Sequence, residues 1–299
     1  MPTTTHSAKG SSETVESRYA EVTQRVAEAA KRSGRRPSDI ILCAVTKHAD
    51  PEQIRTLLHL GHRDFGENRV QVLMQHAAIV EEYLSRQKIV PSARKVSTDD
   101  ASLFTDSKIN LKPATGLPGG SDGVRWHMIG HLQRNKARKV VEFTRLIHSV
   151  DSLRLAEELQ VLALKRENPI EVLLQVNCSG ESQKFGCPIP AAIPMAEQLG
   201  TMINVRLRGL MTMAAETADP EETRSTFRRC RELFEEMSRI GFGENVPFNI
   251  LSMGMSGDYE VAISEGANIV RVGSAIFGDA KPGVEHPELP AEEGEEPQE

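Results

Sequence analysis

The sequence predicts a parallel (β/α)8 barrel, and three observations carry that prediction. Six apolar residues run without a break from Ile40 to Val45 and end in Thr46 and Lys47, a pattern typical of a strand buried on both faces of a parallel sheet. Strand and helix patterns then alternate eight times, which is the number that closes such a barrel. A doubly wound open sheet is the alternative, but no Gly-x-Gly-x-x-Gly motif follows the first strand.

The individual elements follow from apolar periodicity and from residues that start or stop helices. We expect strands at residues 40–47, 62–65, 124–129, 145–149, 170–176, 205–211, 248–251 and 268–272. We expect helices at residues 12–33, 51–60, 67–86, 135–142, from 151 onward, and at 190–199, 220–240, 257–265 and 274–277.

Two helix starts have clear sequence signals. Asp50 is placed as an N-cap with Pro51 at the first helical position, directly after the first strand. Asp219 stands in the same relation to its own helix, and Glu222 three residues later predicts a capping-box pair. Gly241 then marks the end of that helix. Lys47 therefore lies between the end of a buried strand and the start of a helix.

The composition fits one domain with flexible additions. We expect residues 1–11 to be disordered, residues 12–280 to form a single barrel, and residues 281–299 to be a disordered acidic tail. Residues 87–123 contain Gly, Pro, Ser and Lys without periodicity, which predicts a surface insertion; a linker between two domains is the alternative.

Charge and cysteine usage exclude several classes of protein. The net charge is −6, and seven of the glutamates lie in residues 285–299, so the folded body is near +1 and offers no electrostatic case for nucleic acid. No apolar run approaches the roughly 20 residues of a membrane span. The four cysteines have no C-x-x-C spacing, and we interpret them as reduced thiols of a cytoplasmic protein.

Polar residues collect at the predicted carboxyl ends of the strands, where barrels of this type place their sites. In chain order these ends carry Lys47, Asn68, His127 to His131, Ser149, Asn177, Met211 to Met213, Ser252 to Ser256, and Arg271 to Ser274. Lys47 is a candidate for a Schiff base with an aldehyde if burial at the rim lowers its pKa, although a surface lysine that caps a strand is the simpler interpretation.

The last two strand ends predict a phosphate site. The loops after strands 7 and 8 of such barrels commonly bind phosphate, and Ser252 to Ser256 supplies hydroxyl and N–H donors. Gly273 and Ser274 open a short helical segment that favours an anion. A lysine opposite a phosphate site suits a phosphorylated aldehyde, and pyridoxal 5′-phosphate (PLP) is the common one.

Several motifs together resemble the pyridoxal-phosphate homeostasis protein family, whose members are single barrels similar to the N-terminal domain of alanine racemase. The resemblance runs from about residue 12 to 278 and rests on motifs in family order: Ala44-Val-Thr-Lys47, Gly66-Glu-Asn68, Trp126-His-Met-Ile-Gly130, Leu210-Met-Thr-Met213, Leu251-Ser-Met-Gly-Met-Ser256 and Arg271-Val-Gly-Ser-Ala-Ile-Phe-Gly278. Arg69, the long insertion and the acidic tail depart from the family pattern.

The resemblance implies a cofactor site as well as a fold. It implies an internal aldimine of PLP at Lys47, phosphate contacts from the Ser252–Ser256 loop and from Gly273-Ser274, and Arg271 against either the ring nitrogen or the phosphate of PLP. The full set of expected cofactor-binding residues is Lys47, Asn68, Met211, Ser252, Ser256, Arg271, Gly273 and Ser274.

Three functions remain open at this point. The first is a non-catalytic, monomeric protein of the cytoplasm that holds PLP as a lysine aldimine for vitamin B6 homeostasis, with apo-PLP enzymes as acceptors. The second is a PLP-dependent amino-acid racemase or decarboxylase. The third is a Schiff-base aldolase without a cofactor. No metal site is expected, because the i, i+4 spacing of His127 and His131 needs a helix and Gly130 interrupts it.

Overall fold

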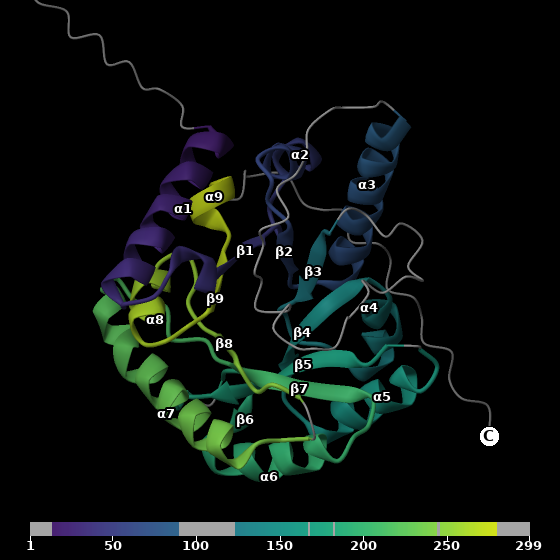
Figure 1. The fold of residues 1–299 in the computed structure, drawn as a ribbon, viewed down its shortest axis with the longest axis vertical. Coiled ribbons are helices and arrows are strands. Elements are labelled where there is room, and N and C mark those ends of the chain that lie inside the picture. The colour runs from purple at the N-terminus through teal and green to yellow at the C-terminus, as the bar shows by residue number, and fades with distance from the viewer. Residues whose placement is uncertain (1–13, 90–122, 167, 182, 244–245, 280–299) are drawn as a thin grey trace, which may run out of the picture.

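Eight parallel strands close into a barrel in the computed structural model, which describes residues 14–89, 123–166, 168–181, 183–243 and 246–279 (Figure 1). Within these ranges the strands follow the order β4-β3-β2-β1-β9-β8-β7-β5, and pairing of β4 with β5 closes the ring. The bounds are β1 Ile41–Val45, β2 Asp64–Glu67, β3 Arg125–Met128, β4 Thr144–Val150, β5 Ile170–Asn177, β7 Val205–Met211, β8 Ile250–Ser252 and β9 Ile269–Val272. The predicted barrel is confirmed. A two-residue strand, β6 (Cys187–Pro188), pairs with β5 and was not predicted.

Helices surround the barrel on its outer side (Figure 1). They are α1 Val15–Arg32, α2 Pro51–His59, α3 Val70–Ile89, α4 Ala137–Phe143, α5 Leu153–Ala163, α6 Ile189–Gly200, α7 Arg224–Ile240, α8 Tyr259–Ser264 and α9 Ser274–Phe277. Asp50 caps α2 as predicted, because its side chain accepts from the backbone N–H of Gln53.

The predicted capping box at Asp219 and Glu222 is wrong. A 3-10 turn over Pro220–Thr223 precedes α7, and the Asp219 side chain caps that turn by accepting from the N–H of Glu221. The Glu222 carboxylate instead accepts a hydrogen bond from the Thr217 hydroxyl. The residues that start the helix were identified correctly, but the tighter first turn changes which N–H group the aspartate reaches.

Alternation along each strand divides the buried residues into two clusters. One cluster lies between the strands and the outer helices and includes most of the core. The other fills the barrel interior with Ile41, Cys43, Leu146, Leu173, Met211, Ile250 and Ile269. Successive strand residues point to opposite faces, so side chains two positions further along an interior-facing strand reach the mouth of the barrel.

Buried ion pairs hold the amino-terminal end of the barrel. Arg125 donates two hydrogen bonds to the Asp64 carboxylate at 2.7 and 2.6 Å. Arg208 donates to Glu171 at 2.8 Å, and Arg145 lies 3.0 Å from the other Glu171 oxygen. Since Arg208 and Glu171 are 3% and 2% exposed at their side chains, each charge depends on the other.

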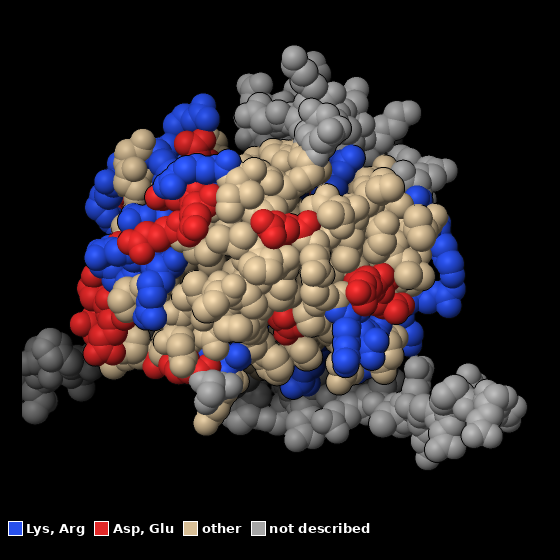
Figure 2. Space-filling model, turned by 90° about the horizontal axis from the view of Figure 1, so that it is seen from below, with Lys and Arg blue, Asp and Glu red and all other residues tan. Residues whose placement is uncertain are grey.

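Several predictions from the sequence lie outside the described residues. They are the disordered start at 1–11, the acidic tail at 281–299, and residues 90–122 of the predicted insertion. On the face in Figure 2, basic and acidic side chains lie in mixed groups around a largely uncharged centre. In the part of the chain that the structure describes, no helix has the length and apolar character needed to span a membrane.

We expect the substitution Glu171→Ala to lower the free energy of unfolding by about 3–5 kcal/mol, because it leaves the buried Arg208 guanidinium without its carboxylate. Equilibrium urea unfolding measures this loss. Glu82→Ala is the control, since the Glu82–Arg86 pair is 61% and 75% exposed at its side chains and should contribute about 1 kcal/mol or less. Equal losses for the two variants would contradict the structural role of the buried pair.

Candidate functional site

The predicted site residues lie along one arc of the barrel mouth, at the carboxyl ends of β7, β8, β9, β1 and β2. The register brings them together: Cys43 of β1 pairs with Arg271 of β9, and Ser252 of β8 pairs with Ile269 of β9. Met211, the last residue of β7, pairs with Ser252 and lies in the interior cluster. Five neighbouring strands therefore contribute to a single site.

Lys47 follows β1 through the buried residue Thr46. The N–H of Thr46 donates to the Gly66 carbonyl at 3.0 Å, and its hydroxyl donates to the buried carboxylate of Glu67. These bonds fix the backbone from which Lys47 projects. The rim burial suggested from the sequence is not seen, because the described residues leave Lys47 exposed.

Asn68 is exposed at the end of β2, and its backbone lies directly against Gly130. A Cβ atom at position 130 would lie 2.1 Å from the carbonyl oxygen of Asn68, which is far inside van der Waals contact. Only glycine fits there, so the loop after β3 can close over the end of β2. This close approach explains the glycine that ends the Trp126–Gly130 motif.

Arg271 is a buried cation whose hydrogen-bond partners are neutral. It is 3% exposed, and it donates to the Ser252 hydroxyl at 2.6 Å and to the Thr212 carbonyl at 2.9 Å. Burial lowers the pKa of Arg271 to about 10, so the guanidinium is still charged at neutral pH. A buried charge with neutral partners is a favourable place for an anionic or electron-rich group.

The short helix α9 begins with backbone donors that converge on one point. Gly273 and Ala275 donate their N–H groups to the hydroxyl oxygen of Ser256 at 3.1 and 3.4 Å. A Cβ atom on Gly273 would lie 3.2 Å from the Val45 carbonyl, so this turn packs tightly against the end of β1. Ser274 is exposed at the start of the helix. The oxygen of Ser256 thus occupies a place that suits an anion oxygen.

A buried hydrogen-bonded chain lies across the barrel interior behind Arg271. The Nδ1 atom of His148 is 3.0 Å from the Ser252 hydroxyl, and the Nε2 atom of His148 is 2.9 Å from Nδ1 of His127. The Nε2 atom of His127 is 3.2 Å from the carboxylate of Asp64, at the amino-terminal end of the barrel. Both histidines are fully buried.

The sequence alone did not predict this row of hydrogen-bonded side chains. The sequence places His127 among the polar residues at the strand ends and gives it no role beyond a rejected metal site, and it does not single out His148 or Asp64. One signal was present, since His127 and His148 each follow an apolar residue and precede the end of a predicted buried strand. The metal hypothesis gains no support: His131 is exposed and stacks on Phe185 at 4.3 Å between ring centroids, whereas His127 points into the barrel. Among the described residues there is no cluster of three or more potential metal ligands.

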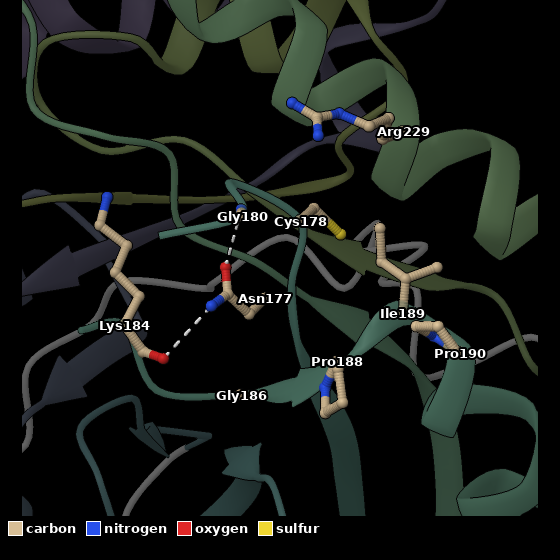
Figure 3. A pocket seen from close by; sticks show the side chains of 9 residues that line it. All are labelled: Asn177, Cys178, Gly180, Lys184, Gly186, Pro188, Ile189, Pro190 and Arg229. Atoms are coloured by element: carbon tan, nitrogen blue, oxygen red, sulfur yellow. Dashed lines mark hydrogen bonds between the residues drawn. The ribbon is translucent and has the colours of Figure 1, made fainter. Parts of the chain in front are cut away.

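Two other predicted strand-end residues lie apart from the site. Ser149 is buried in β4, and within the described ranges its hydroxyl has no hydrogen-bond partner. Asn177, at the end of β5, faces a cavity of about 410 Å³ that Cys178, Lys184 and Arg229 also line (Figure 3). Its side chain accepts from the N–H of Gly180 at 3.2 Å and donates to the Lys184 carbonyl at 3.4 Å, so it organises its own loop.

Comparison with known proteins agrees with the fold. Residues 20–281 match the family described as "Alanine racemase, N-terminal domain". The chain is 35% identical to the pyridoxal phosphate homeostasis protein of Pseudomonas aeruginosa, over 89% of this chain and 95% of that one. It is 34% identical to the protein of the same name from Aquifex aeolicus, over 88% and 97% of the two chains.

Two solved structures are similar in fold to this chain. The structure of PipY from Synechococcus elongatus with PLP bound is 30% identical, with a TM-score of 0.62 over 86% of this chain and all of that one. An alanine racemase from Clostridium difficile is 15% identical, with a TM-score of 0.54 over 88% of this chain and 57% of that one. The second likeness is one of fold alone.

The buried histidines predict that the free energy of unfolding depends on pH. Burial holds the pKa of His148 well below its usual value of 6.5 and also lowers the pKa of His62. Below about pH 6.5 the unfolded chain binds these protons and the folded chain does not, so stability falls as the pH falls, by up to about 1.4 kcal/mol per pH unit per histidine. We expect a lower free energy of unfolding at pH 5.5 than at pH 7.5.

Urea unfolding at both pH values measures this difference. The variant His62→Phe is the control, because it removes one of the two groups and preserves an aromatic ring against Phe65 and Tyr19. It should show a smaller difference between the two pH values than the wild-type protein. Equal or greater wild-type stability at pH 5.5 would contradict the depressed pKa values.

Proposed function

Because this chain belongs to the family of pyridoxal phosphate homeostasis proteins, we propose that it binds PLP and acts in intracellular PLP and amino-acid homeostasis. The PLP bound in the related PipY structure supports this choice of ligand. We further propose that Lys47 holds the cofactor covalently and reversibly. The single observation in this chain that carries the proposal is the buried Arg271 guanidinium with neutral partners, beside converging N–H donors at α9.

The residues of the arc fit the chemical groups of PLP. An exposed amine at Lys47 can react with the aldehyde, and the N–H groups of Gly273 and Ala275 can donate to a phosphate oxygen in the place of the Ser256 hydroxyl. Arg271 then lies against the ring nitrogen or the phosphate. Bound PLP supplies a conjugated ring that withdraws electrons from an attached amine.

The remaining predicted residues have supporting roles in this proposal. Ser252 fixes Arg271 and Ser274 opens the helix that faces the phosphate. Met211 provides an apolar floor under the ring, and Asn68 lies at the rim next to Lys47. We propose that the protein is a monomer of the cytoplasm, where its four free cysteines stay reduced, and that apo-PLP enzymes accept its cofactor.

A PLP-dependent racemase is the second candidate, because the fold resembles that of alanine racemase. Racemisation needs an acid/base group on each face of the cofactor, and the tyrosines of this chain have other positions. The hydroxyl of Tyr19 bonds to His62 at 3.1 Å, and that of Tyr83 bonds to His59. Tyr259 is buried in α8, with the guanidinium of Arg25 over its ring. This placement favours a carrier.

We expect the substitution Lys47→Ala to abolish the visible absorbance of bound PLP, because the amine of Lys47 is exposed at the end of β1, whereas the amine of Lys184, near the end of β7, donates to the Ala214 carbonyl at 2.6 Å. Lys47→Arg is the matched control: it retains the positive charge but cannot form the covalent link, so it should lose the absorbance and retain more affinity for PLP than Lys47→Ala. Spectroscopic titration measures both properties. Borohydride reduction of the wild-type protein followed by peptide mapping should find the adduct on Lys47, and an adduct on another lysine would contradict the assignment.

We expect at most trace racemisation of L-alanine by the PLP-loaded protein, since one missing acid/base group typically costs about 10²–10⁴-fold in rate. Chiral chromatography of the amino acid after incubation measures it. Boiled protein and free PLP at the same concentration are the controls. A turnover number in the ordinary enzyme range, roughly 1–10³ per second, that is lost on Lys47→Ala would establish the racemase instead.

A further inference from the structure

The hydrogen-bonded chain behind Arg271 runs through the whole interior of the barrel. It begins at the Arg125–Asp64 pair at the start of β2 and β3 and continues through His127 and His148 to Ser252 at the end of β8. It ends where Arg271 donates to the Ser252 hydroxyl at 2.6 Å. The chain joins the structural end of the barrel to the arc that faces the proposed cofactor.

The carboxylate at one end and the guanidinium at the other set the directions of the two outer hydrogen bonds, and one proton on each imidazole between them sets the rest. Burial alone would raise the pKa of Asp64, but the hydrogen bonds from Arg125 and His127 hold it well below its usual value, so the carboxylate can only accept. His127 therefore donates from Nε2, and with a single proton on this imidazole its Nδ1 accepts. His148 must then donate from its own Nε2.

The same reasoning fixes the other end of the chain. A neutral His148 that donates from Nε2 has an unprotonated Nδ1, which can only accept. The Ser252 hydroxyl therefore donates to His148, and its oxygen lone pairs face Arg271, which can only donate. With one proton on each imidazole, the four buried side chains from Asp64 to Ser252 have a single consistent arrangement of their polar hydrogens.

We propose that His148 is a positioning residue for the cofactor site: it orients the Ser252 hydroxyl so that this oxygen holds the Arg271 guanidinium at the barrel mouth. This inference rests on the proposed function, because it assigns Arg271 to the cofactor. Without an acceptor at Nδ1 of His148, the Ser252 proton has no fixed direction and competes with Arg271 for space around the same oxygen. The guanidinium then loses one of its two described anchors, and the other is the Thr212 carbonyl.

A pair of substitutions separates this role from simple packing. The side-chain amide of Asn places an oxygen near the position of Nδ1 of histidine, whereas that of Gln reaches the position of Nε2. His148→Asn can therefore still accept from Ser252 and loses the bond to His127. His148→Gln retains the bond to His127 and loses Ser252. Both variants remove one ring from the same buried site.

We expect His148→Gln to weaken PLP binding by roughly two- to tenfold, the value of one net hydrogen bond, and His148→Asn to stay within about twofold of the wild-type protein. Spectroscopic titration measures both, and thermal unfolding checks that each variant is folded. Ser252→Ala with and without His148→Gln completes the test: the double variant should bind no more weakly than Ser252→Ala alone. Equal affinity loss in the Asn and Gln variants, or no loss in either, would overturn the proposal.

A measurement on the wild-type protein keeps the test decisive if the variants do not fold. Nitrogen-15 NMR of the free protein should show His148 neutral, with its proton on Nε2 and an unprotonated Nδ1. A proton on Nδ1 would overturn the proposal. The proposed function and the positioning role of His148 can be contradicted independently. Wild-type protein that does not bind PLP contradicts the proposed function, whereas the tautomer of His148 is measured without any ligand.

Discussion

A single buried positive charge determines how the mouth of this barrel is built. Arg271 lies on the interior face of β9, where water cannot solvate it, so its donors must find acceptors in the protein. The acceptors are the Ser252 hydroxyl and the Thr212 carbonyl, at the ends of β8 and β7. These bonds engage two of the N–H donors of the guanidinium without neutralising its charge. The positions of three neighbouring strand ends are therefore tied to one side chain.

The arginines at the two ends of the barrel have different kinds of hydrogen-bond partner, and this difference distinguishes a structural role from a binding role. At the amino-terminal end, Arg125 and Arg208 each bond to a carboxylate, which makes a self-sufficient set of charges. At the carboxyl end, Arg271 has only neutral acceptors among its described hydrogen bonds. A balanced pair needs no ligand, whereas an unbalanced cation is stabilised by one. This contrast supports the proposal that the ligand binds at the carboxyl end.

The sequence was sufficient for the barrel and for the arc of the site, because both depend on local patterns. The apolar run before Lys47 and the polar residues after Ser252 mark strand ends whatever their partners are. The chain of His127, His148 and Asp64 was beyond such analysis, since its members come from three strands and meet only when the barrel closes. Likewise, the exposure of Lys47 and the 3-10 turn before α7 depend on tertiary packing and backbone geometry that no motif records.

The exposure of Lys47 favours a carrier of the cofactor over a catalyst. A catalyst must exclude water and present a group to each face of its cofactor. Here Met211 lies in the buried interior of the barrel, whereas Lys47 is exposed to solvent. The tyrosines that could serve as a second acid/base group are held by His62, by His59 and within α8. In the proposed site, water at a covalent link to Lys47 would allow hydrolysis and release of the cofactor, which is what a protein that exchanges its cofactor requires.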